Sequence, residues 1–190
     1  MGVWIAIAIV LFVLGNMMAL KPNSSDQRID NLRMTARGLQ LNPKLVTCPD
    51  WVKGKDNEYG KGMIGQYALV LEGVRFPHAR YQPINGEWRP DSSVISSTES
   101  DGSAHPLNFV LDKVPLDLPS TIEPFVKALL IKANCIVIYW EDAAYVRPSS
   151  NPGFHTRAIE PDLTVLKSQL EAWALAMQAS LQRKAKSSHY

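Results

Sequence analysis

The 190-residue sequence predicts an α+β protein: one N-terminal transmembrane helix, then a soluble domain in which a mostly antiparallel sheet packs with about three helices. Three observations support this class. The chain opens with an uncharged apolar run, its middle alternates apolar runs with turn residues, and its C-terminal part repeats apolar residues at helical spacing. The roughly 165 residues after the apolar run are enough for one domain with its own core.

Residues 1–20 form the predicted transmembrane anchor. About twenty apolar residues at ~1.5 Å per residue match the ~30 Å hydrocarbon core of a bilayer. No Lys or Arg precedes the run and no small-residue cleavage pattern follows it, which favours an uncleaved anchor over a signal peptide. The anchor side chains are Trp4, Ile5, Ile7, Ile9, Val10, Leu11, Phe12 and Leu14.

Basic residues follow the anchor, whereas only the α-amino group precedes it. Because Lys and Arg are retained on the cytoplasmic side, we expect a single-pass protein whose C-terminal domain is cytoplasmic. The cations that could contact anionic lipid are Lys21, Arg28, Arg33 and Arg37.

An amphipathic connecting helix is predicted within residues 21–38. Ser24 and Gln27 have the spacing of a capping box, and Gly38 is a typical stop signal. Between them, apolar residues recur at helical spacing: Ile29, Leu32, Ala36 and Leu39. This apolar face suits a membrane surface or a domain core, and both alternatives stay open.

The soluble α+β domain is expected over residues 39–190. Its extended segments are predicted at 39–48, 63–72, 74–84 and 107–111. Asn85-Gly86 favours the positive φ angles of a type I′ turn, so residues 80–84 should pair with 87–89.

Prolines and serines mark the irregular parts. Pro77 and Pro83 indicate that the segment 74–84 is an edge strand. Residues 49–61 combine charged side chains with Gly54 and Gly60 and are expected to form a loop. Residues 91–106 are rich in serine and poor in large apolar side chains, which predicts a mobile loop.

The second half of the domain begins with a predicted helix over 120–133, since Ser120 and Glu123 form another capping box. Residues Cys135–Trp140 (CIVIYW) are continuously apolar, as in a central strand buried on both faces. Glu141 and Asp142 are expected to be solvated turn residues, followed by a partner strand at 143–147.

The last predicted helix covers 162–184. Its apolar residues follow a 3, 4, 3, 4 spacing: Leu163, Leu166, Leu170, Trp173 and Met177. The pattern spans only two heptads, which favours packing on the core over a coiled coil. Trp140 and Trp173 are expected in that core, whereas Trp51 and Trp88 lie near loops and are candidate partner contacts.

No motif predicts a catalytic residue, a cofactor site or a metal site. The four histidines, at 78, 105, 155 and 189, have no second ligand at metal-binding spacing. Cys48 and Cys135 form no CxxC and are expected to be unpaired, buried thiols in a cytoplasmic domain, whereas a periplasmic domain would allow them to pair. The run GKGMIG, with glycines at 60, 62 and 65, precedes a strand rather than a helix, so we assign these glycines to a hairpin or loop. The formal net charge of +2 argues against nucleic-acid binding.

Four features occur together in this chain: the anchor, Leu32–Leu41 (LRMTARGLQL), Cys135–Trp140 and Leu166–Ala174 (LKSQLEAWA). The chain thereby resembles a group of uncharacterised single-pass inner-membrane proteins of Gram-negative bacteria, some labelled YajC-like preprotein translocase subunits. The resemblance implies a bacterial inner-membrane location and a link to protein translocation. It implies no catalytic residue.

The expected function is that of a non-enzymatic, membrane-tethered adaptor or accessory subunit, because tethering raises the effective concentration of a domain near membrane partners. Its partners would be membrane lipid through residues 2–20 and an unknown membrane or cytoplasmic protein; the oligomeric state stays open. Two alternatives remain. One is a membrane-anchored, hydrolase-like enzyme built from scattered polar residues, and the other is a module that senses anionic lipid through residues 25–37.

Overall fold

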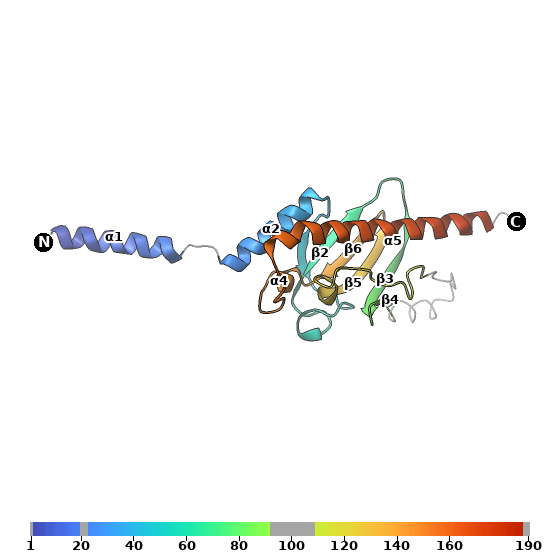
Figure 1. Ribbon diagram of the computed structural model, residues 1–190, viewed down its shortest axis with the longest axis horizontal. Coiled ribbons are helices and arrows are strands. Elements are labelled where there is room, and N and C mark those ends of the chain that lie inside the picture. The colour runs from blue at the N-terminus through green and yellow to red at the C-terminus, as the bar shows by residue number, and fades with distance from the viewer. Residues whose placement is uncertain (1, 20–22, 92–108, 188–190) are drawn as a thin grey trace.

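The computed structural model describes residues 2–19, 23–91 and 109–187 (Figure 1). The described α-helices are α1 (Gly2–Ala19), α2 (Ser24–Gly38), α4 (Asp142–Tyr145) and α5 (Ile159–Ser187). The described strands are β1 (Lys44–Thr47), β2 (Met63–Val70), β3 (Phe76–Ile84), β4 (Glu87–Pro90), β5 (Val126–Ala133) and β6 (Cys135–Trp140). The fold is α+β, as the sequence predicts.

These strands form one sheet in the order β1-β2-β6-β5-β3-β4, and each neighbouring pair is antiparallel. β6 lies between β2 and β5, and every residue of it except Cys135 is buried. A strand covered on both faces needs a continuous apolar run, which CIVIYW supplies. The prediction that Cys135–Trp140 is a central strand is therefore confirmed.

The predicted hairpin is present as β3 and β4. Ile84 pairs with Glu87 across Asn85 and Gly86, whose φ angles are 54° and 76°. Both angles are positive, as a type I′ turn requires.

The prediction that residues 74–84 are extended is confirmed over Phe76–Ile84. Their predicted place at the edge of the sheet is wrong, because β3 lies between β5 and β4. Its prolines are placed where a missing N–H is tolerated. Pro77 lies in an irregularity of the pairing with β5, and Pro83 lies beyond Tyr81, the last residue of β3 paired with β5.

The helix predicted over 120–133 is also wrong. A 3-10 helix at Glu123–Phe125 is followed by β5, which pairs with both β3 and β6. Apolar residues that match a helical period also suit a strand buried on both faces. Pairing with two neighbouring strands outweighs the local capping signal at Ser120.

Three shorter predictions have different outcomes. Residues 143–147 do not form a strand, because α4 occupies most of them. Phe109–Leu111, the described end of the strand predicted at 107–111, forms coil and a turn. The loop predicted at 91–106 lies outside the described residues except for Asp91.

α5 crosses one face of the sheet, and its predicted apolar seam is buried there (Figure 1). Trp173 packs edge-on against Trp88 of β4, with ring centroids 5.2 Å apart. Trp140 of β6 belongs to the same buried cluster. The prediction that Trp140 and Trp173 share one core beneath the last helix is confirmed.

α2 covers the same face beside α5 and confirms the connecting helix. The N-cap of α2 is Asn23 and not the predicted Ser24. The Asn23 side chain accepts a hydrogen bond from the Ser25 N–H. Leu32 and Ala36 are completely buried in the domain core. Of the two alternatives for this apolar face, packing on the domain is the one observed.

The segment between β1 and β2 covers part of the opposite face. Cys48 and Val52 pack there against residues of β2, β5 and β6. Trp51 lies edge-on to Tyr139 with ring centroids 5.8 Å apart, and the Arg80 guanidinium lies 5.1 Å from a Trp51 ring centroid.

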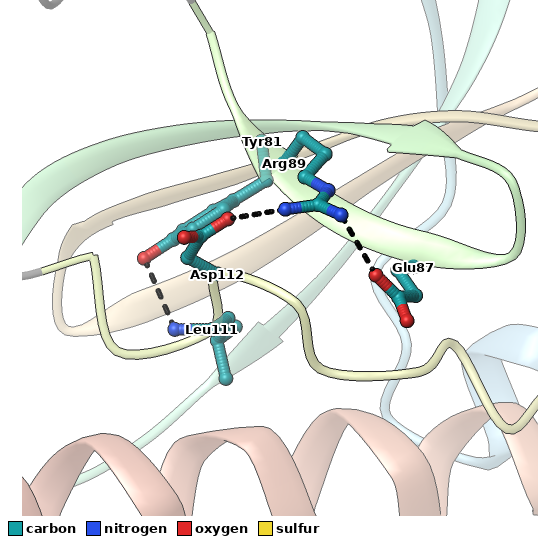
Figure 2. Close-up of polar contacts among 5 residues, drawn as sticks. All are labelled: Tyr81, Glu87, Arg89, Leu111 and Asp112. Carbon is teal, nitrogen blue, oxygen red and sulfur yellow. Dashed lines mark hydrogen bonds and ion pairs between the residues drawn. The ribbon is translucent and has the colours of Figure 1, made fainter.

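Polar contacts join the chain that resumes at residue 109 to the hairpin (Figure 2). The Leu111 N–H donates to the Tyr81 hydroxyl at 3.5 Å. The Arg89 guanidinium reaches Glu87 at 3.0 Å and Asp112 at 3.5 Å. Both ion pairs are partly exposed to solvent, so they fix geometry more than they add stability.

α1 stands apart from the sheet (Figure 1). The eight side chains assigned to the anchor are all exposed, from 45% for Ile7 to 78% for Trp4. Among the described helices, none combines the length and the apolar character that crossing a membrane demands. Bilayer crossing by α1 therefore stays a prediction.

Candidate functional site: the cavity beside Asp142

Two side chains that are distant in sequence meet at Asp142, the first residue of α4. Its carboxylate is almost completely buried. Oδ2 accepts hydrogen bonds from Arg33 Nε at 3.0 Å and from the Tyr67 hydroxyl at 3.2 Å, and Arg33 Nη2 lies 3.0 Å from the same oxygen. Because Arg33 belongs to α2 and Tyr67 to β2, one carboxylate joins three elements.

Gly65 of β2 makes room for this carboxylate. A Cβ at position 65 would lie 2.7 Å from Asp142 Cγ, which is closer than van der Waals contact allows. Gly65 lies in β2, which confirms the predicted strand at 63–72 and contradicts the assignment of this glycine to a hairpin or loop. The assignment of Asp142 to a solvated turn is wrong, because its carboxylate is buried. A glycine inside a strand often marks such a close approach, and this signal could have identified Gly65 from the sequence.

The electrostatics favour a structural role for this cluster. Burial, and then the negative charge of Asp142, raise the pKa of Tyr67 far above its ordinary value, so the phenol stays a donor. The Asp142 carboxylate accepts hydrogen bonds from the Arg33 guanidinium and from the Tyr67 phenol. The arrangement therefore holds α2, β2 and α4 together and does not present an unpaired base.

A cavity of about 500 Å³ opens beside the cluster. Its walls come from α2, the edge strand β1, β2, the loop before β2, and α4 with the residues on either side of it. They include Ile29, Leu45, Lys55, Met63, Asp142 and Arg147. This volume lies within the ~300–1,000 Å³ typical of small-molecule sites.

The three described cations that were candidates for lipid contact, Arg28, Arg33 and Arg37, do not share one face of α2. Arg33 faces inward to Asp142, so its assignment as a lipid contact is wrong. Arg28 and Arg37 are nine residues apart on α2, which places them about 180° apart around the axis at ~3.6 residues per turn. Lys21 lies outside the described residues.

The two tryptophans predicted as partner contacts have different environments. Trp88 is completely buried against Trp173, so its prediction as a contact is wrong. The cause is the hairpin turn, which places β4 beneath α5 instead of in a loop. Trp51 is half-buried, and its role as a partner contact stays a prediction.

The two cysteines are free thiols in the structure. Cys48 is buried, and burial raises the pKa of its thiol. Cys135 is only half-buried, so the expectation of two buried thiols holds for one of them. In the described part of the chain, no three His, Cys, Asp or Glu side chains are grouped so as to hold a metal ion.

Comparison with known proteins finds no family model, no curated protein and no solved structure that matches this chain.

Proposed function

We propose that the protein is a membrane-tethered adaptor or accessory subunit of a bacterial inner-membrane complex, with α1 as the tether. The resemblance described above points to a complex that serves protein translocation. The main support is the contrast between α1 and α2. The described apolar side chains of α1 are all exposed, whereas Leu32 and Ala36 of α2 are completely buried in the domain.

The connection from tether to domain supports this proposal. Leu32 and Ala36 bury the inner face of α2, and Arg33 adds an ion pair with a buried carboxylate. The domain would therefore be attached close to the membrane through a helix that is part of its own core. Such an arrangement suits presentation of a surface to a membrane partner.

The alternatives have less support. An enzyme would need an available acid, base or nucleophile, and Asp142 is bound by Arg33 and Tyr67. A lipid sensor that uses one basic face of α2 would need Arg28 and Arg37 on the same side, and they point in opposite directions.

The domain is proposed to be cytoplasmic, because Lys and Arg follow α1. Alkaline phosphatase, which is active only in the periplasm, should be inactive when fused after Tyr190. High activity would reverse the proposed orientation.

Membrane attachment is tested with two double variants of the full chain. Ile9→Lys with Phe12→Lys places two charges on α1, and Val165→Lys with Leu175→Lys places two charges on exposed apolar positions of α5. After alkaline carbonate extraction, the wild type and the α5 variant should stay with the membrane and the α1 variant should be released. Equal release of the two variants would contradict a tether at α1.

The adaptor role is tested by cross-linking in cells, followed by purification of the full chain from detergent-solubilised membranes. The same membrane protein should co-purify with the wild type and with the α5 variant, and its recovery should fall in the α1 variant. If no protein is enriched over the α1 variant, the adaptor proposal fails even where membrane attachment is intact.

A further inference from the structure

We infer that the cavity beside Asp142 binds an anionic amphiphile, a molecule with a phosphate or carboxylate head and an aliphatic chain. The inference rests on the proposed membrane tether only for the source of this ligand. Its chemistry is inferred from the charge and the apolar surface of the cavity.

The cavity lining has an excess of unpaired positive charge. Its two carboxylates are already paired, Asp142 with Arg33 and Glu141 with Lys127 at 3.6 Å. The remaining lining cations are Lys55 and Arg147, which are exposed and form no ion pair with any other described residue. An anionic head group in the cavity would face these two cations, and charge-assisted hydrogen bonds from them would hold it.

The apolar part of the wall accounts for the aliphatic chain. Leu45 is 48% exposed and Met63 is 57% exposed, and both line the cavity with half-buried Ile29. An aliphatic chain laid against these side chains would remove apolar surface from water. A fully hydrophilic anion such as inorganic phosphate would leave that surface exposed.

The position of the cavity makes a bilayer lipid a reasonable source. α2 begins at Ser24, five residues after the end of α1 at Ala19, so at most ~18 Å of chain separates them. Ile29 lies in the second turn of α2, and α2 and α4 lie at the same end of the domain (Figure 1). With α1 in a membrane, the head groups of that membrane would be near the cavity.

The test uses the full chain in a neutral detergent and measures bound amphiphile by native mass spectrometry. Dodecyl phosphate is the free probe, and phosphatidylglycerol and phosphatidylcholine are the anionic and zwitterionic lipid probes. The cavity variant is Lys55→Gln with Arg147→Gln. The matched control, Lys53→Gln with Arg157→Gln, removes one exposed Lys and one exposed Arg that do not line the cavity.

Dodecyl phosphate should bind once per chain, and the cavity variant should bind it about tenfold more weakly or worse, because two charge-assisted contacts are lost. The control should bind like the wild type, and both variants should melt near the wild-type temperature because the substituted side chains are exposed. Leu45→Asn should also weaken binding, whereas Leu175→Asn on α5 should not. Equal binding by the cavity variant and its control would overturn the inference.

The lipid arms identify the source. Stronger binding of phosphatidylglycerol than of phosphatidylcholine, lost in the cavity variant, supports a bilayer lipid; binding of dodecyl phosphate alone supports a free amphiphile. Equal binding of phosphatidylglycerol and phosphatidylcholine would overturn the inference, because the head-group charge would then have no effect. If the wild-type chain binds dodecyl phosphate but is released from membranes by carbonate, the proposed tether is refuted and the proposed cavity site stands. A membrane-bound chain whose cavity variant binds normally would refute the site alone.

Discussion

Gly65 lies against a carboxylate that cannot easily move, because Arg33 and Tyr67 hold it from two sides. Gly65→Ala should therefore lower the free energy of unfolding by about 1–3 kcal/mol, as overpacking does elsewhere. Gly38→Ala is the matched control, since a Cβ there meets nothing within 4 Å. It should be neutral or stabilise by up to ~1 kcal/mol, because it restricts the unfolded chain. Urea denaturation of both variants measures the contrast, and equal effects would refute the close approach at Asp142.

Tyr81 gives the molecule a dependence on alkaline pH. Burial raises the pKa of its phenol to about 12, against ~10 in the unfolded chain. The unfolded state loses this proton first, so the contribution is fully present below about pH 10 and is lost as pH rises from about 10 to 12. Tyr81→Phe should make the fall in unfolding free energy over this range less steep, and Tyr59→Phe at an exposed position should not. Urea midpoints at several pH values measure the slope; identical slopes in the two variants would be the contrary result.

At the scale of elements, α5 is expected to act as the cover of the sheet. Trp173→Ala should cost about 3–5 kcal/mol, because a buried indole is removed from its contact with Trp88 and a cavity remains. Leu175→Ala, two residues along the same helix but 65% exposed, should change stability by less than ~0.5 kcal/mol. Thermal melting separates the two. If Trp173→Ala melted like the wild type, the seam of α5 would be an interface instead of a core.

The turn between β5 and β6 contains an unfavourable residue. Ala133 has a φ of 52°, a conformation that costs an L-residue about 1–2 kcal/mol and that glycine adopts freely. Ala133→Gly should therefore stabilise the protein by up to ~1 kcal/mol. Ala176→Gly, at an exposed position inside α5, should destabilise it by about the same amount. Two shifts of the same sign in chemical denaturation would contradict the strained turn.

The sequence predicts some elements well because local chemistry decides them. The Asn85-Gly86 turn, the run Cys135–Trp140 and the seam of α5 each carry a signal within a few residues. The local signal at β5 is misleading, because it predicts a helix. The strand character of β5 depends on pairing with β3, which lies about fifty residues earlier.

The candidate site could be predicted less well. The contact of Arg33 with Asp142 joins residues 109 apart in sequence, and no local pattern encodes it. Trp88 lies near a turn, which predicts a surface position, but the packing of α5 buries it.

At the scale of the whole molecule, the apolar helix α1 is expected to insert into a membrane while the adjacent domain stays outside it. The expected consequence concerns the five tryptophans of the chain. Trp4 belongs to α1, whereas Trp88, Trp140 and Trp173 are buried in the domain core and Trp51 is half-buried. Only the indole of Trp4 should come near lipid.

The most direct measurement is the tryptophan fluorescence of the full chain, reconstituted into vesicles with or without brominated lipid, which quenches indoles in the bilayer. The wild type should lose the share of its emission that Trp4 contributes, and Trp4→Phe should lose almost none. Trp51→Phe is the control and should be quenched like the wild type. Equal quenching of the wild type and Trp4→Phe, or none in either, would contradict insertion of α1 into the membrane and with it the tethered adaptor.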